Sequence, residues 1–114
     1  MQQLIWKRIS TLARKNNNIL YCCVQNEILV QWSKMNFSFT EDMLYTILQE
    51  FFSDGAEKVM GASMTDPPKD GFGWYLYNRF PHYSPRHASV IAAIMYDLGL
   101  LDYRVKKAVY LRKK

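Results

Sequence analysis

The stretch "SPRHASVIAAIMYDLGLL", residues 84–101, decides the fold. Ser84 is a residue type that caps helix N-termini, and Pro85 follows at the first helical position, where its missing N–H is not needed. Gly99 stands where a helix ends, because glycine readily adopts the left-handed conformation of a helix C-terminus. The stretch therefore predicts an amphipathic helix over residues 84–98.

The predicted helix has two different faces, set by the turn of about 100° per residue. One face gathers apolar side chains, with His87 close to its edge: Val90, Ile91, Ile94, Met95 and Leu98. The other gathers small side chains and one tyrosine, with Arg86 near its edge: Ser89, Ala92, Ala93 and Tyr96. A small-residue face fits the close approach of a DNA groove, and it equally fits packing against a neighbouring helix or a dimer partner.

The elements around this helix follow from the same signals. Apolar residues at helical spacing predict helices, and apolar runs joined by a short polar turn predict a hairpin. We expect a helix over 41–53 capped by Thr40 or by Ser38, a loop over 56–71 that holds a helical turn or a short strand, a short helix over 72–80, and a β-hairpin over 100–112 with the basic turn "RVKK".

The N-terminal third carries weaker signals. Apolar residues at positions 4, 5, 9 and 12 predict a short helix over 3–15. Two β-branched and aromatic runs, at 19–24 and 28–32, flank the turn-compatible triplet "QNE" and predict a β-hairpin. We expect one α+β domain over 1–114, with a helix plus hairpin over 1–38 and a second part over 39–114.

Charge is distributed unevenly along a chain of 114 residues whose net charge is +5. Residues 1–20 hold four bases and no acid, residues 21–70 hold eight acids and three lysines, and residues 71–114 hold eight bases and two acids. Two basic ends around an acidic middle predict one electropositive face that attracts a polyanion. A solvated, lysine-rich C-terminal tail is the simpler alternative for the last residues.

Several classes of protein are not expected. The sequence has no apolar run of the ~20 residues that a membrane span needs, and its first ten residues carry charges in place of a signal peptide's apolar core. Cys22 and Cys23 are adjacent, which suits neither a disulfide framework nor a zinc site. Paired carboxylates, nucleophile motifs and metal-ligand spacings are absent from the sequence. We expect a cytoplasmic protein that is not an enzyme and uses no cofactor or metal.

The order of three helices followed by a hairpin with a basic turn resembles the winged-helix form of the helix-turn-helix domain, over residues 40–112. The resemblance implies a scaffold helix at 41–53, a helix pair made of a first helix at 72–80 and a recognition helix at 84–98, and a wing at 100–112. Two features depart from the pattern: the loop before the helix pair is long, and the recognition helix has a single arginine on its outer face.

The resemblance implies double-stranded DNA as the partner. The residues that it assigns to nucleic-acid binding are Tyr83 and Ser84 for a phosphate, Arg86 for a guanine or a phosphate, Ser89, Ala93 and Tyr96 on the outer face, and Arg104, Lys106, Lys107 and Arg112 in the wing. A homodimer would be typical, and the function would be transcription control or a role in a mobile element or phage.

A second hypothesis comes from size and charge. Small basic proteins rich in aromatic residues include the inhibitors that phages and plasmids use against host nucleases, anti-CRISPR proteins and anti-restriction proteins among them. Such a protein, or an adaptor, would bind a protein or nucleoprotein partner through protein contacts. The acidic segment 41–70 could then mimic nucleic-acid phosphates, or it could be a solvated helix face and loop.

Overall fold

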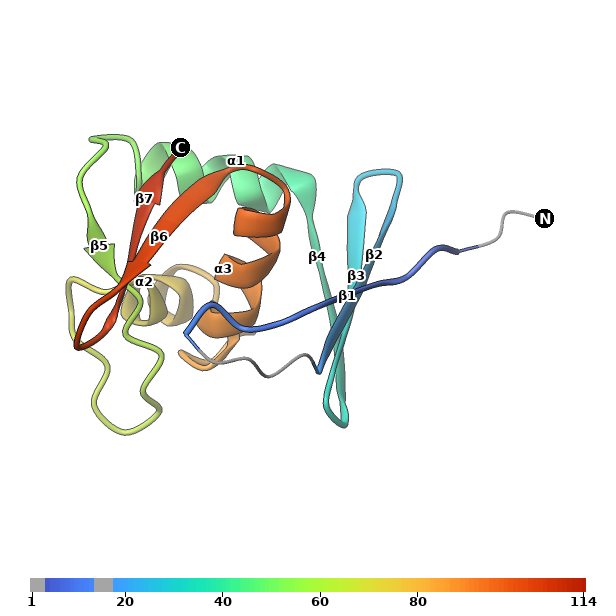
Figure 1. Ribbon diagram of the computed structural model, residues 1–114, viewed down its shortest axis with the longest axis horizontal. Helices are drawn as coiled ribbons and strands as arrows, with labels where there is room; N and C mark the ends of the chain where they lie inside the picture. The colour runs from blue at the N-terminus through green and yellow to red at the C-terminus, as the bar shows by residue number, and fades with distance from the viewer. Residues whose placement is uncertain (1–3, 14–17) are drawn as a thin grey trace.

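The computed structural model describes residues 4–13 and 18–114, which form three helices and two antiparallel sheets (Figure 1). This confirms the α+β class. In chain order the elements are β1 (Lys7–Ile9), β2 (Ile19–Val24), β3 (Glu27–Trp32), β4 (Met35–Thr40), α1 (Glu41–Glu50), β5 (Lys58–Val59), α2 (Phe72–Arg79), α3 (His87–Asp97), β6 (Leu101–Val105) and β7 (Val109–Lys113). Within the described ranges, every helix is too short or too polar to cross a membrane.

The N-terminal sheet has the order β1-β2-β3-β4, and two-residue turns join β2 to β3 and β3 to β4. Gln25 and Ser33 each begin such a turn with a positive φ, 58° and 56°. A positive φ at the first residue of a two-residue turn gives a twist that matches the right-handed twist of the flanking strands. Alternate side chains of the sheet, among them Ile19, Ile28 and Phe39, are buried and point to one shared core.

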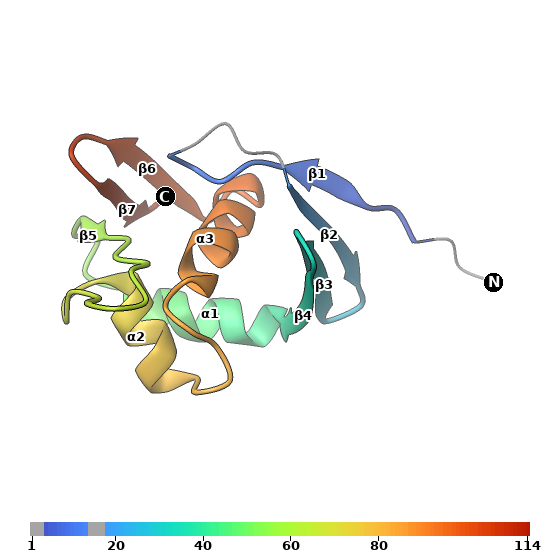
Figure 2. The same ribbon diagram turned by 90° about the horizontal axis from the view of Figure 1, so that it is seen from below.

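The second sheet has the order β5-β7-β6, so the short strand β5 ties the C-terminal hairpin to the segment before α2. Helix α3 lies between the N-terminal sheet and this hairpin, and α1 runs beside both (Figure 2). At the end of α3, the N–H of Gly99 bonds to the carbonyl of Tyr96, and the N–H of Leu100 bonds to that of Met95. This paired arrangement, with Gly99 at φ 80°, is the glycine C-cap that the sequence predicts.

Two sequence predictions were wrong at the N-terminus. No helix forms within residues 4–13; instead Lys7–Ile9 is strand β1, paired with β2. The four apolar positions fit either structure, and an isolated helix shorter than about 15 residues is marginal, so pairing with a neighbouring strand prevails. The parts of the predicted helix at residue 3 and at 14–15 lie outside the described residues. Strand β4 was missed, because its "FSF" was interpreted as the approach to a helix cap.

Helix boundaries differ by a few residues from those predicted. The side chain of Thr40 caps α1, accepting the N–H of Met43 at 3.1 Å, which excludes the alternative cap at Ser38. Helix α1 ends at Glu50 rather than at residue 53. Helix α3 begins at His87 rather than at residue 84. Before the regular helix, the N–H groups of residues 87–89 bond to the carbonyls of residues 84–86, three positions earlier, as in a 3₁₀ turn.

Candidate nucleic-acid interface

Helix α3 is buried on almost every side. Ala92 and Ala93, which the sequence placed on an outward face, are 0% and 1% exposed. Ser89 is half-buried, and Tyr96 is exposed while its ring meets the ring of Tyr103 edge to face at 4.8 Å. The prediction of an open small-residue face is therefore wrong for the alanines, and a further segment of the chain lies beside Ala93.

That segment belongs to residues 4–13, the N-terminal strap, whose part after β1 crosses α3 in both views (Figures 1 and 2). Ile9 and Leu12 of the strap pack against the core. A hollow of about 610 Å³ remains between the strap and the helix, lined by residues 8–13 together with Ala93, Tyr96, Asp97 and Tyr103. Direct contact between DNA bases and the stripe from Ser89 to Tyr96 would require the strap to leave.

Asp97 links the strap and the N-terminal sheet to α3. Its carboxylate receives Lys7 Nζ of β1 at 2.9 Å and the hydroxyl of Tyr21 of β2. Partial burial opposes ionisation of Asp97, but these two hydrogen bonds hold its pKa below the usual value. Burial and the neighbouring carboxylate raise the pKa of Tyr21, so its hydroxyl stays protonated and keeps donating.

The turn before α3 uses most of the groups that the sequence offered to a phosphate. The Tyr83 hydroxyl donates to the carbonyl of Ser38 at 2.7 Å, and the Ser84 N–H donates to Nδ1 of His87 at 3.0 Å. His87 is 8% exposed, and its ring lies against Phe37 at 4.8 Å. Burial lowers the pKa of His87. Tyr83 and Ser84 thus stabilise this turn through hydrogen bonds within the protein, and these groups are not available to a phosphate.

In the C-terminal hairpin, Arg104 is held by an acid. Its Nη2 lies 2.7 Å from Oε1 of Glu57 and its Nε contacts the other carboxylate oxygen, while the guanidinium lies 5.0 Å from the Tyr110 ring centre. These bonds, helped by the nearby charges of Arg112 and Lys106, lower the pKa of Glu57. Arg112 stands opposite Asp102 in the pairing of the two strands. Two of the four predicted wing cations therefore have acidic neighbours.

Arg86 differs from these residues, because its side chain is exposed and faces two adjoining hollows. Its guanidinium carbon lies 5.6 Å from the ring centre of Trp32, a cation–π contact. The larger hollow, about 660 Å³, runs from Trp32 and Arg86 past Ser89 to Ala108 in the β6–β7 turn. The smaller, about 310 Å³, contains Trp32 and Arg86 again, with Lys34 at its rim. We call the two hollows together the Arg86 groove.

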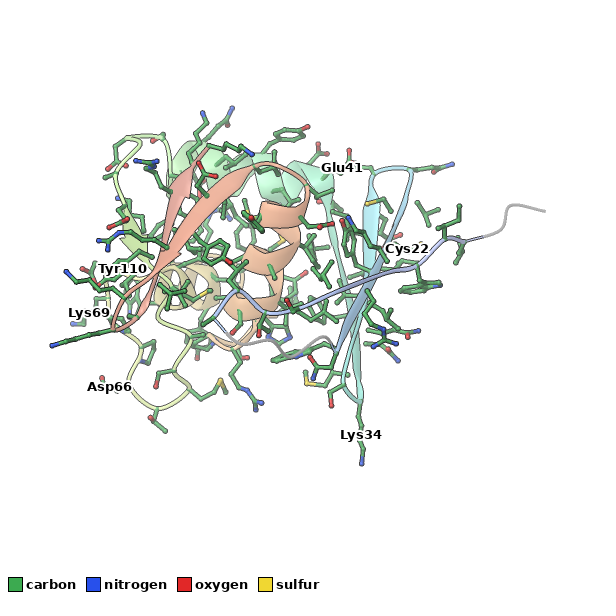
Figure 3. The ribbon with its side chains drawn as sticks, viewed as in Figure 1. Cys22, Lys34, Glu41, Asp66, Lys69 and Tyr110 are labelled. Atoms are coloured by element: carbon green, nitrogen blue, oxygen red, sulfur yellow. The ribbon has the colours of Figure 1, made fainter. Side chains whose placement is uncertain are left out.

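The charged side chains that line the Arg86 groove, within the described residues, are the cations Arg86 and Lys34. Among the described residues, no Asp or Glu lines either hollow. The β6–β7 turn at one end continues from Ala108 into the exposed side chains of Lys106 and Lys107. At the other end Lys34 projects from the β3–β4 turn (Figure 3). Of the predicted residues, Arg86 lines the groove, and Lys106 and Lys107 precede its lining residue Ala108 in the chain; Trp32 and Lys34, which the sequence reasoning missed, also line it. A lysine two residues after a tryptophan, at a strand end, was the available signal.

Among the described residues, no three His, Cys, Asp or Glu side chains gather in a way that could hold a metal ion. In comparisons with known proteins, no protein-family model, no curated protein and no solved structure matches the chain.

Proposed function

We propose that this protein binds duplex DNA through its phosphate backbone, using the Arg86 groove and the turn between β6 and β7. The order of α1, α2, α3 and a C-terminal hairpin supports a winged-helix arrangement of residues 39–114, with β6–β7 as the wing. Fold likeness alone does not carry a function, so the proposal depends on the charges.

The observation that carries the proposal is the grouping of exposed cations around a groove without acidic lining. Arg86 at the start of α3 lines the groove, and so does Ala108 of the hairpin turn, which follows the exposed Lys106 and Lys107 in the chain. Such a grouping raises the local potential and attracts a polyanion. Contacts of lysine and arginine with phosphates supply most of the affinity of non-specific DNA binding.

We expect weak discrimination between DNA sequences. Base edges are read by side chains that enter a groove, and the strap covers the face of α3 that would do so. Arg86 is the one exposed side chain at the start of α3 that can reach a guanine. Binding should therefore depend strongly on salt and weakly on sequence.

The test is a titration of a 20-base-pair duplex, followed by fluorescence anisotropy at several salt concentrations. Replacing Lys106 and Lys107 by Gln removes two phosphate contacts and should reduce the slope of log K against log[salt] by about 2. The matched control replaces Lys113 and Lys114 at the opposite end of the hairpin by Gln, with the same loss of charge and no effect on the slope. Absence of binding at about 10 µM protein in 50 mM salt would refute the proposal.

A second candidate function is binding to a protein or nucleoprotein partner, as in a phage-encoded inhibitor. The position of the strap over α3 favours it, because a helix whose outer face is covered cannot read DNA bases. Retention of one protein from a nuclease-treated lysate, unchanged by the Lys106 and Lys107 substitutions, would favour this candidate over DNA binding.

A further inference from the structure

The smaller hollow of the Arg86 groove joins the N-terminal sheet to the start of α3. It is lined by Asn18, Trp32, Ser33, Lys34, Met35 and Arg86. The tight turn between β3 and β4, with Ser33 at φ 56°, places Lys34 at the tip of the sheet, where its ammonium is exposed. Two cations, a hydroxyl and an amide thus surround the same hollow, and no acid of the described chain lines it.

Arg86 is positioned for an anion by its contact with Trp32. The cation–π contact with the indole holds the guanidinium beside the hollow, and a guanidinium presents several N–H donors that match phosphate oxygens. Among the described residues, no carboxylate forms an ion pair with Arg86, whereas Arg79 and Arg104 are paired with Glu50 and Glu57. The N–H groups of residues 87–89 bond to carbonyls of the preceding turn, so the available donors belong to side chains.

We propose that Lys34 and Arg86, with Trp32 as the platform for Arg86, form a clamp for one backbone phosphate of a nucleic acid. The clamp rests on the proposed DNA binding and extends it: the N-terminal sheet becomes part of the interface. The groove continues from Arg86 to Ala108, so a strand whose phosphate occupies the clamp leads toward Lys106 and Lys107. The phosphates of a DNA strand are regularly spaced, so one strand could contact Lys34, Arg86 and the lysines of the β6–β7 turn in succession.

The experiment uses the full chain with Trp6 and Trp74 replaced by Phe, which leaves Trp32 as the single tryptophan. Its fluorescence is recorded while a 20-base-pair duplex is added, and anisotropy of the labelled duplex gives the affinity. We expect the fluorescence change to saturate together with binding. Lys34→Gln should reduce the salt slope by about 1, which is one phosphate contact.

Arg86→Gln should reduce the slope by a similar amount, about 1, and also abolish the Trp32 response. The matched control is Lys113→Gln, with the same change of charge at the far end of the hairpin, which should alter neither readout. Urea unfolding of each variant confirms that these exposed substitutions leave the fold intact.

The outcomes separate the two proposals. Duplex binding with an unchanged salt slope in Lys34→Gln and no response of Trp32 overturns the clamp and leaves the proposed function standing. Absence of duplex binding overturns both. Displacement of the duplex by an oligo-glutamate peptide of equal charge, with the same Trp32 response, overturns the assignment to nucleic acid in favour of an acidic peptide.

Discussion

Gly73, in the first turn of α2, is where a single methyl group should disturb the architecture most. A Cβ at this position would lie 2.2 Å from the carbonyl oxygen of Gly61 and 3.2 Å from that of Pro85. The Gly73 N–H also donates to the carbonyl of Met60 at 2.8 Å. Three backbone segments therefore meet at this glycine, and no side-chain rotation can relieve the clash.

The effect of Gly73→Ala can be worked out from these contacts. Alanine in place of glycine favours a helix by up to about 1 kcal/mol. Overpacking against rigid backbone opposes this by about 1–3 kcal/mol, and weakening the hydrogen bond to Met60 adds about 1 kcal/mol. We expect the free energy of unfolding to fall by about 2 kcal/mol, which lowers Tm by roughly 8 °C or more in a chain of this size.

The assay is urea unfolding followed by tryptophan fluorescence, with Gly55→Ala as the matched control. Gly55 has φ 70°, and no heavy atom lies within 4 Å of the place that an added methyl group would take, so the control carries backbone strain without a clash. Its loss of stability should be about 1 kcal/mol. A Gly73→Ala protein as stable as the wild type, or no less stable than Gly55→Ala, would refute the packing argument.

Three further predictions concern charge, pH and a turn. Glu57→Gln frees Arg104 and should tighten duplex binding and steepen its salt slope, whereas Glu27→Gln, an equal charge change at the β2–β3 turn, should do neither; anisotropy measures both. Burial lowers the pKa of His87 below its ordinary 6.5, so the unfolded chain binds more protons below that pH. The free energy of unfolding should therefore be highest, as far as His87 affects it, above pH 7, and should decrease as the pH is lowered through about 6.5. The His87→Gln variant should lack this decrease in urea titrations at a series of pH values. Gln25→Gly should raise the free energy of unfolding by about 0.5 kcal/mol, because relief of the strain at φ 58° outweighs the larger backbone entropy of glycine.

The helices and hairpins that were predicted correctly have local signals in the sequence. The cap at Thr40, the apolar stripe of α1 and the glycine C-cap at Gly99 depend on residues within a few positions of one another. The same holds for the turn between β2 and β3, which two β-rich runs bracket. Such signals fix the type of an element well and its ends within a few residues.

The exposure of α3 and the pairing of charges were not predictable, because both depend on distant segments. Alanine gives no preference between a buried and an exposed helix face, so only the strap decides that Ala93 is covered. Arg104 meets an acid 47 positions earlier in the chain. From its neighbours in the sequence, Arg104 looks like a basic hairpin residue that contacts a phosphate. The acid that pairs with it, Glu57, comes from the segment just before β5.

The position of Asp97 favours a scaffold role for α3 over the role of a recognition helix. An acid at a helix C-terminus is unfavourable, because it adds negative charge to the negative end of the helix dipole. Lys7 and Tyr21 offset this, and both belong to the N-terminal sheet, so the acid serves to fasten that sheet and the strap to the helix. A helix fastened in this way is a scaffold. Arg86 stands exposed just before its first turn, and under the proposed function DNA contact shifts from the helix face to the turns at the ends of the two sheets: β3–β4 with Lys34, and β6–β7 with its lysine pair.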